Sequence, residues 1–288
     1  MTAASFNAIN KIFSIFFAVF FALTGFINKS FSGDVYKWES ETDAAFAEAL
    51  PRSQGVTTDG KYWYFSGKHY LEKVDIEKNE VISYENDAIP AELSEKFGSK
   101  HIGGISYYDG IIYAGVEDSK VWAHPLIVLF SAEDLSFTGK YFEVPAKYHT
   151  HGIPYVIADG ENSVIYAGDA NNDEEMMKYD MNTGEYLGKF KYNSPVTKIQ
   201  GGEYYGGFLY VGTNDSTRAV YRINVETGTA EKLFDRIMYQ PKKIDNFGGE
   251  GEGLTILKMA DGTSLHTLQV GATFTETSLR HYKFNLDD

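Results

Sequence analysis

Short apolar runs, separated by turns that contain glycine and aspartate, recur along most of the chain. Five segments share one order: a leading glycine, a short apolar strand, a two-residue turn and a second strand. The turns are Asp59-Gly60, Asp109-Gly110, Asp159-Gly160, Gly206-Gly207 and Asp261-Gly262. Tight hairpins need positive backbone φ angles, which Gly and Asp tolerate. The leading glycines are Gly55, Gly104, Gly152, Gly201 and Gly253, at separations of 49, 48, 49 and 52 residues.

A repeat of this length built only from short strands is typical of β-propeller blades. The segments lack a period of about 3.6 residues, so a solenoid of helices is not predicted. Third strands are expected to begin near Tyr70, Leu126, Met177, Val220 and Leu279. Fourth strands are expected near Val81, Lys140, Tyr186 and Ala230. The sequence therefore predicts an all-β chain with five blades of four strands; a ring of six blades is the alternative.

The fifth unit lacks a fourth strand of its own. We expect the strand-like segment at 35–40 to complete this blade from the N-terminal side, because an open sheet edge is otherwise left unpaired. Two short helices are expected outside the strands. One spans Thr42–Leu50 and stops at Pro51, and the other spans Pro90–Phe97 with its proline at the start.

An uncharged apolar run at 12–27 lies between Lys11 and Lys29. A positive flank followed by a short apolar run is the pattern of a secretory signal peptide, and the run is shorter than the ~20 residues of a full membrane span. Residues 1–33 are therefore expected to be a signal peptide or an uncleaved signal anchor, and 34–288 a single propeller domain. Both alternatives export the propeller, and the second attaches it to a membrane only through this segment.

Composition narrows the range of functions. Apolar residues make up 43% of the chain, the formal net charge is −14 and there is no cysteine. A large negative charge repels phosphate backbones, so nucleic acid is not an expected partner. The absence of cysteine excludes disulfides, thiolate zinc sites and a cysteine nucleophile.

Candidate chemistry gathers where the first strand of each unit begins. In a propeller these strands surround a central channel, and their starts lie around one mouth of it. Loops on such a rigid scaffold are where function is usually found. Polar residues directly before the leading glycines or at the ends of second strands are the expected ligand-binding groups: Gln54, Gln200, Asp169 and Asn214.

Three histidines, His101, His149 and His151, fall at these positions, and the first hypothesis is that they bind zinc, copper, iron or nickel. Glu250 or Glu252 would then be a further ligand or a general base, with Glu117 as an additional catalytic candidate. In the second hypothesis carboxylate and amide oxygens bind Ca²⁺, and a histidine acts as acid or base. In the third these groups only line a water-filled channel. The residues leave all three open.

The Asp-Gly hairpins, the turns at Asp180 and Asn224 that end in Thr-Gly, and the Glu-Gly-Leu-Thr run at Glu252 resemble one broad superfamily. It includes gluconolactonase-like, strictosidine-synthase-like and glutaminyl-cyclotransferase-like propellers, and the resemblance covers about residues 52 to 284. It implies the blade fold. The expected function is action on a small molecule or sugar, as a metal-assisted hydrolase or lyase. The competing class is a non-catalytic scaffold that binds protein or glycan.

Overall fold

The computed structural model describes residues 38–44, 52–118, 121–236, 249–271 and 276–286, the first of these ranges by its backbone alone. Residues 36–288 form one compact unit. The expected leader at 1–33 lies outside the described residues. None of the described helices is long and apolar enough to cross a bilayer.

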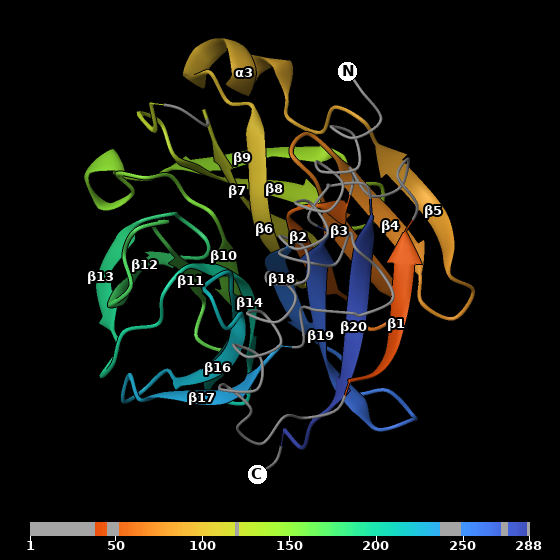
Figure 1. The fold of residues 1–288 in the computed structure, drawn as a ribbon. Helices are drawn as coiled ribbons and strands as arrows, with labels where there is room; N and C mark the ends of the chain where they lie inside the picture. The colour runs from red at the N-terminus through yellow and green to blue at the C-terminus, as the bar shows by residue number, and fades with distance from the viewer. Residues whose placement is uncertain (1–37, 45–51, 119–120, 237–248, 272–275, 287–288) are drawn as a thin grey trace, which may run out of the picture. The chain divides into compact units, whose positions relative to one another are not determined.

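The described chain forms five antiparallel sheets of four strands, arranged as the blades of a propeller (Figure 1). Blade 1 contains β2 (Gly55–Thr58), β3 (Tyr62–Ser66), β4 (Leu71–Asp75) and β5 (Glu80–Glu85). Blade 2 contains β6 (His101–Tyr108), β7 (Ile111–Glu117), β8 (Leu126–Ser131) and β9 (Phe137–Glu143). Blade 3 contains β10 (Val156–Asp159), β11 (Val164–Ala167), β12 (Glu175–Asp180) and β13 (Tyr186–Lys191).

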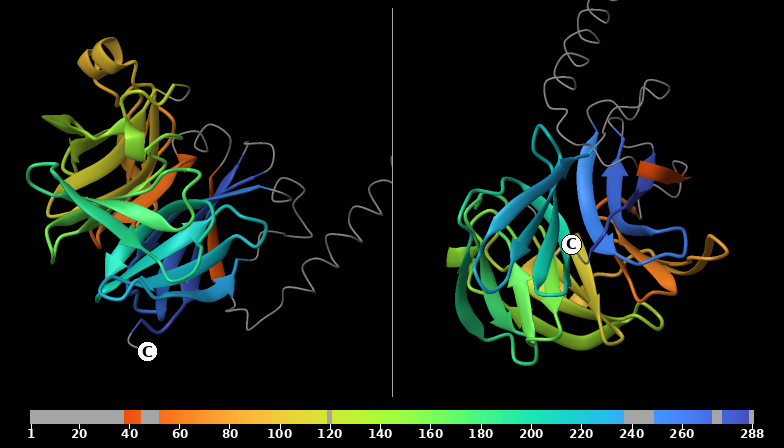
Figure 2. Two further views of the ribbon diagram at one scale, coloured as in Figure 1. Left: turned by 90° about the vertical axis from the view of Figure 1, so that its left-hand side faces the viewer. Right: turned by 90° about the horizontal axis from the view of Figure 1, so that it is seen from below.

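Blade 4 contains β14 (Ile199–Tyr205), β15 (Phe208–Thr213), β16 (Ala219–Asn224) and β17 (Ala230–Asp235). Blade 5 contains β18 (Glu250–Ile256), β19 (Thr263–Val270), β20 (Thr277–Lys283) and β1 (Trp38–Ala44). Figure 2 shows the same five sheets from two further sides. The prediction of five blades is confirmed, and the third strands begin within two residues of the expected positions.

In blade 5, β1 pairs with β20 in antiparallel register from Trp38 opposite Tyr282 to Ala44 opposite Thr277. The strand expected at 35–40 overlaps β1 only in its last three residues. The helix expected over 42–50 is wrong at its start, because Thr42–Ala44 belong to β1, and its remainder lies outside the described residues. The open edge of β20 offers these residues a row of backbone partners, and a short isolated helix is marginally stable.

The second expected helix is confirmed as α3 (Ala91–Phe97). It begins after Pro90 and ends at Gly98, which has the left-handed φ of 71° and donates its N–H to the Ser94 carbonyl. Leu93 and Phe97 are one turn apart and are both buried against the core of blades 1 and 2. The helix thus covers the end of that core.

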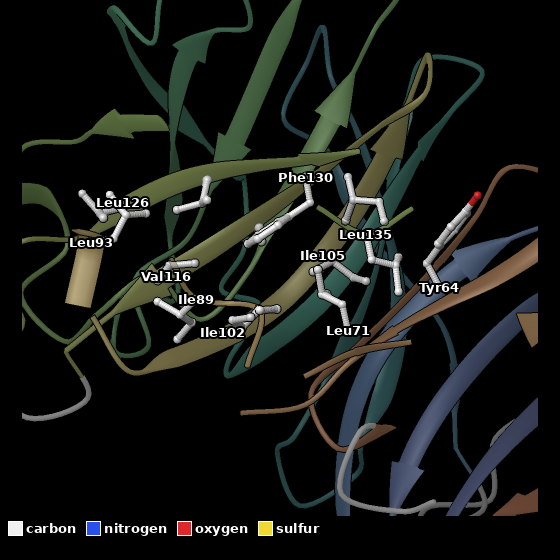
Figure 3. Close-up of a cluster of buried hydrophobic side chains, with 14 of the residues drawn as sticks. Tyr64, Leu71, Ile89, Leu93, Ile102, Ile105, Val116, Leu126, Phe130 and Leu135 are labelled. Carbon is white, nitrogen blue, oxygen red and sulfur yellow. The ribbon is translucent and has the colours of Figure 1, made fainter. Parts of the chain in front are cut away.

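Most of the core lies between neighbouring blades. The cluster shared by blades 1 and 2 contains Tyr64, Leu71, Ile105 and Phe130, each no more than 2% exposed (Figure 3). Comparable clusters of aromatic and β-branched side chains occur in the rest of the ring. Since each blade buries both faces against its neighbours, its strands read as nearly continuous apolar runs, which explains the strength of the repeat in the sequence.

Four leading glycines form a ring of close backbone contacts around the propeller axis. A Cβ atom on Gly55 would lie 2.9 Å from Gly104 Cα, and one on Gly253 would lie 2.9 Å from Gly55 Cα. A Cβ on Gly201 would lie 2.8 Å from Gly253 Cα, and one on Gly104 only 2.6 Å from the Gln200 carbonyl oxygen. These distances leave no space for a side chain. The repeat glycines are therefore required by the closure of the inner strands, and we call Gly55, Gly104, Gly201 and Gly253 the glycine ring.

Blade 3 departs from this spacing. Gly104 bridges Tyr155 in parallel, and the Ala158 amide donates to Ser106 Oγ at 3.0 Å, as an amide of blade 2 donates to blade 1. Tyr155 therefore occupies the place that the glycine ring has in the other blades. Gly152, which the sequence places there, lies three residues earlier. Residues whose places were predicted by counting from Gly152 therefore lie three residues away from the equivalent places in the other blades.

Candidate functional site

The starts of inner strands and the ends of second strands lie at one end of the channel, as expected for the mouth. In blade 2, His101 opens β6 and is opposite Glu117 at the end of β7. His101 Nε2 lies 2.9 Å from Gln54 Oε1, and its Nδ1 lies 3.3 Å from Glu117 Oε1. The Gln54 amide oxygen accepts, so Nε2 carries a proton and donates it, whereas Nδ1 approaches Glu117 without making a hydrogen bond. The first two blades thus contribute a linked imidazole, amide and carboxylate.

Glu117 also connects blade 2 to the loop that precedes β10. Its second oxygen, Oε2, accepts the backbone N–H of Ile153 at 2.8 Å. Gly152 passes so close that a Cβ there would lie 1.8 Å from the same oxygen, and its φ of +88° also favours glycine. The blade-3 glycine that the repeat analysis singled out therefore makes room for Glu117.

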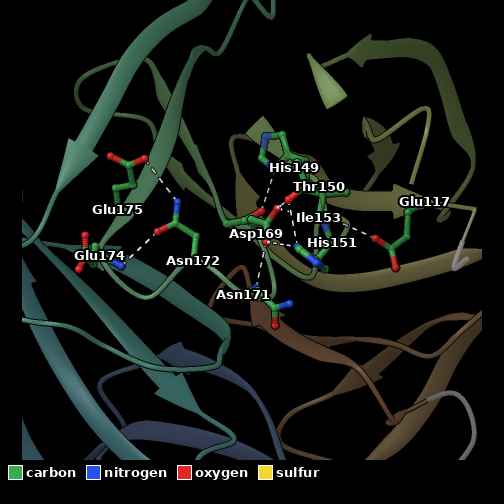
Figure 4. A network of polar contacts seen from close by, with 11 residues as sticks. Glu117, His149, Thr150, His151, Ile153, Asp169, Asn171, Asn172, Glu174 and Glu175 are labelled. Atoms are coloured by element: carbon green, nitrogen blue, oxygen red, sulfur yellow. Dashed lines mark hydrogen bonds and ion pairs between the residues drawn. The ribbon is translucent and has the colours of Figure 1, made fainter. Parts of the chain in front are cut away.

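Asp169 organises the loops at the mouth of blade 3 (Figure 4). Its Oδ2 accepts the N–H of His151 at 3.0 Å and the hydroxyl of Thr150 at 3.2 Å, and its Oδ1 accepts the N–H of Asn171 at 2.9 Å. His151 Nδ1 lies 3.5 Å from Asp169 Oδ1. The Asp169 side chain is 6% exposed, whereas that of His151 is 42% exposed. A buried carboxylate thus orients an accessible imidazole.

Trp122 adds an aromatic surface to this loop cluster. Its ring centroid lies 5.5 Å from that of His151, and the residue is half-buried. The backbone around it is fixed by Asp118, whose carboxylate accepts the N–H groups of Val121, Trp122 and Ala123 at 2.8, 2.8 and 3.3 Å. The sequence analysis did not select Trp122, because nothing in the repeat distinguishes it.

His149 is not part of the mouth. It is fully buried, with Nδ1 at 2.8 Å from the Gly168 carbonyl oxygen and Nε2 at 2.7 Å from the Tyr179 hydroxyl. A carbonyl only accepts, so Nδ1 carries the proton and Nε2 accepts from the tyrosine. Burial lowers the pKa of His149, which keeps the ring neutral. Both nitrogens are occupied, and the register of blade 3 explains why His149 does not align with His101.

The three histidines therefore have separate partners. Within the described ranges no group of three or more His, Asp or Glu side chains is arranged so that it could hold a metal ion. Glu117 lies 3.3 Å from His101 Nδ1 and accepts the backbone N–H of Ile153, two residues after His151. The structure brings together Gln54, His101 and Glu117 on one side, and His151 with Asp169 on the other.

The blade 4 and 5 side of the mouth contains a buried pair of carboxyl groups. Glu252 is 4% exposed and hydrogen-bonds Glu250. Burial, together with the charge of Glu250, raises the pKa of Glu252 well above the usual value for Glu. Burial and the charge of Glu250 therefore favour the protonated form of Glu252, while Arg236 acts in the opposite direction.

Arg236, which the sequence analysis missed, lies beside this pair. Its guanidinium donates to the carbonyl oxygens of Arg218 at 2.7 Å, Leu268 at 3.4 Å and Thr213. Burial lowers the pKa of Arg236 to about 10, so the group remains charged at neutral pH. Its place at the end of blade 4, next to the carboxyl pair, could not be read from the repeat.

Two other predicted residues lie nearby. Asn214 Oδ1 accepts the N–H of Gly251 at 3.1 Å and so ties blade 4 to blade 5. Gln200 precedes the glycine ring in β14 and is half-buried. The Asn214 side chain is therefore occupied by a hydrogen bond between blades, while part of the Gln200 residue remains solvent-accessible at the mouth.

The most unusual carboxylate, Glu203, was not predicted. It lies in β14, two residues beyond the glycine ring, and accepts hydroxyl groups from three other blades. Thr57 Oγ1 and Thr255 Oγ1 donate to its Oε2 at 2.9 and 3.0 Å, and Ser106 Oγ donates to its Oε1 at 2.9 Å. We call Glu203, Thr57, Ser106 and Thr255 the axial knot.

Burial raises the pKa of Glu203 to about 7, although the three hydroxyl groups act in the opposite direction. Part of the residue remains solvent-accessible, while its carboxyl group lies among atoms of four blades. The sequence does hold a signal for this cluster. A Ser, Thr or Glu stands two residues after the leading glycine in four units and is absent from blade 3, where the register differs.

The fold and this arrangement of groups define the chain as a five-bladed β-propeller with polar clusters at one mouth and on its axis. No protein-family profile and no curated protein matches the chain. Among solved structures 1214 chains match it. One is the computationally designed Ika4 protein, at 12% identity and a TM-score of 0.36, over 71% of this chain and 99% of that one. A likeness of this size carries no argument about function.

Proposed function

We propose that the mouth on blades 1 to 3 binds a small polyhydroxylated molecule of the sugar class. The observation that carries this proposal is the pairing of a buried Asp169 with an accessible His151, beside the ring of Trp122. Small-molecule sites combine an apolar or aromatic wall with a few oriented polar groups. Carboxylate, imidazole and amide groups match sugar hydroxyls, and an aromatic ring matches the apolar face of a sugar.

The same geometry supports proton transfer to or from the bound molecule. Asp169 holds the backbone N–H of His151 and accepts the Thr150 hydroxyl, which in turn lies 3.0 Å from His151 Nδ1. In the described chain no hydrogen bond occupies His151 Nε2. An imidazole oriented by a carboxylate is the usual general acid or base. The Glu252 carboxyl, whose pKa is raised by burial, is a second candidate proton donor beside Arg236 at this mouth. We therefore favour a hydrolase or lyase over a scaffold that only binds protein or glycan.

Tryptophan fluorescence tests the proposal. The protein is titrated with neutral and acidic monosaccharides, and a saturable change in emission is expected for at least one of them. Trp122→Phe should abolish the change, because it removes the reporter at the site. Asp169→Asn should weaken binding about tenfold or more, since it removes the charge that orients His151.

Asp180→Asn is the matched control. Asp180 also holds a loop by accepting backbone N–H groups, from Asn182 at 2.9 Å and Thr183 at 2.8 Å, but it lies at the opposite end of blade 3. Its substitution should leave binding unchanged. Equal losses in both variants, or no saturable binding by calorimetry to any sugar in the panel, would contradict the proposal. Product analysis by NMR then separates catalysis from binding alone.

Export and the wider relationship are further parts of the proposal. The apolar run at 12–27 supports delivery across a membrane, either with cleavage near residue 33 or as an anchor. The blade motifs support a place among gluconolactonase-like and related propellers. Metal analysis before and after dialysis against EDTA tests the zinc, copper, iron, nickel and calcium hypotheses, which still concern His101 and His151.

A further inference from the structure

The outermost strand of each blade leaves one row of backbone N–H and C=O groups without a partner strand. In the described chain β1, β5, β9, β13 and β17 are such edges, each paired only with the strand on its inner side. β1 also lacks lysine and glycine, but it is described by its backbone alone, so only the other four can be compared by their side chains. Proteins protect exposed edges from pairing with other chains by placing lysine, glycine or irregular backbone on them. The four edges are therefore expected to carry such features.

Three of the four edges do. β9 contains Gly139-Lys140 and β13 contains Gly188-Lys189, and both glycines have positive φ, at 80° and 123°. β17 contains Lys232. β5, by contrast, has the sequence Glu-Val-Ile-Ser-Tyr-Glu and contains neither lysine nor glycine. The break in its register at Ile82 is a feature that all four edges share.

β5 also has the most exposed large apolar side chains of these four edges. Val81, Ile82 and Tyr84 of β5 are 47%, 48% and 46% exposed. The other large apolar side chains with comparable exposure in the described chain are scattered over separate elements: Tyr108, Val121 and Leu187. The ring of Tyr84 stacks on Tyr70, with centroids 6.0 Å apart, which extends the apolar surface. A grouped apolar patch on an edge strand marks an interaction site.

Acidic side chains surround this patch. Glu77, Glu80, Glu85 and Asp87 are all exposed, whereas Lys78 lies 3.8 Å from Asp75 and the Lys73 ammonium group is buried, donating to the carbonyl oxygens of Ala132 and Glu133. Each acid attracts positive charge on an incoming chain. We propose that β5 receives an extended, positively charged peptide segment of another protein, which adds a strand to blade 1 by β-augmentation.

Charge also argues against a second copy of this chain as the occupant. An antiparallel pair of β5 strands centred between Ile82 and Ser83 would place Glu80 of each copy directly opposite Glu85 of the other. Like charges that face each other across strands are destabilising. A strand with lysine or arginine at these places would instead form attractive pairs on both sides of the apolar centre.

The test uses a capped, fluorescently labelled nonapeptide in which lysine alternates with threonine and valine. Its anisotropy is measured against the full chain at low and at high salt. We expect saturable binding that weakens with salt, and no binding of the same peptide with glutamate in place of lysine. Amide hydrogen exchange over 80–85 should slow when the lysine peptide binds.

Ile82→Lys should reduce the affinity at least tenfold, because it places a like charge on the edge. Leu187→Lys is the matched control, since Leu187 of β13 is equally exposed at 48%, and it should leave binding unchanged. Val81→Lys serves in place of Ile82→Lys if that variant is poorly folded by circular dichroism. Each of four results would overturn the proposal: no binding of the lysine peptide, equal binding by Ile82→Lys, self-association that Ile82→Lys abolishes, or full protection of the 80–85 amides in the free chain.

Discussion

The axial knot makes the stability of the fold depend on pH in an unusual direction. Most carboxyl groups in proteins stabilise the folded state when they are ionised. Glu203 does the reverse, because burial raises its pKa from 4.5 to about 7. The folded protein then binds this proton more tightly than the unfolded chain does. The contribution is fully present below pH 4.5 and is lost as the pH rises through about 7.

The magnitude follows from the two pKa values, 4.5 and about 7. At 1.36 kcal/mol for each pKa unit, the Glu203 contribution to the free energy of unfolding falls by about 3 kcal/mol between pH 4 and pH 8. Glu203→Gln has the shape of the protonated acid and carries no charge at any pH. We therefore expect this variant to match the wild type at pH 4.5 and to exceed its stability by about 3 kcal/mol at pH 8.

Urea unfolding at pH 4.5, 6, 7 and 8, followed by circular dichroism, measures this difference. Subtraction of the two profiles removes the other titrating groups, which both proteins share. Glu203→Leu is a useful contrast, because it leaves three hydroxyl groups without their acceptor and should be about 1 to 3 kcal/mol less stable than Glu203→Gln at every pH. Parallel profiles for the wild type and Glu203→Gln would show that the carboxyl group is ionised throughout, and the reasoning on the axial knot would then be wrong.

Three further substitutions test the packing of the glycine ring and a buried ion pair. Gly201→Ala should lower the free energy of unfolding by more than about 2 kcal/mol, because its Cβ would lie 2.8 Å from Gly253 Cα. The loss is measured as a lower melting temperature. Gly212→Ala in β15, where the nearest atom is 3.4 Å away, should cost far less, and a similar cost at both sites would count against the glycine ring. Arg52→Ala removes the partner of the buried Glu72 and should cost about 3 kcal/mol in urea unfolding. A loss below about 1 kcal/mol would mean that the pair is hydrated.

The sequence predicts the blades well because each blade is built by local rules. Hairpin turns such as Asp109-Gly110 are fixed by the φ angles that two residues allow, and apolar strands follow from burial on both faces. Glu117, His101 and Gln54 could also be placed together, because strand pairing sets which residues meet at a strand end. Where the blades repeat regularly, position in the repeat is a reliable guide to position in space.

The candidate site is harder to predict because it depends on departures from the repeat. Gly152 matches the leading glycines in sequence, yet Tyr155 occupies their place, and this shift of three residues buries His149 against Tyr179. Trp122 and Arg236 lie outside the repeated segments, so no spacing points to them. Glu203 could have been found from its place two residues after a leading glycine. Its raised pKa could not, since that depends on the summed burial by four blades.

The glycine ring limits what can pass along the propeller axis. Backbones of opposite and neighbouring blades approach so closely there that a single side-chain carbon would not fit between them. A molecule the size of a sugar therefore has no path along the axis at this level. Anything that bound on the His101 side would enter and leave at that same end.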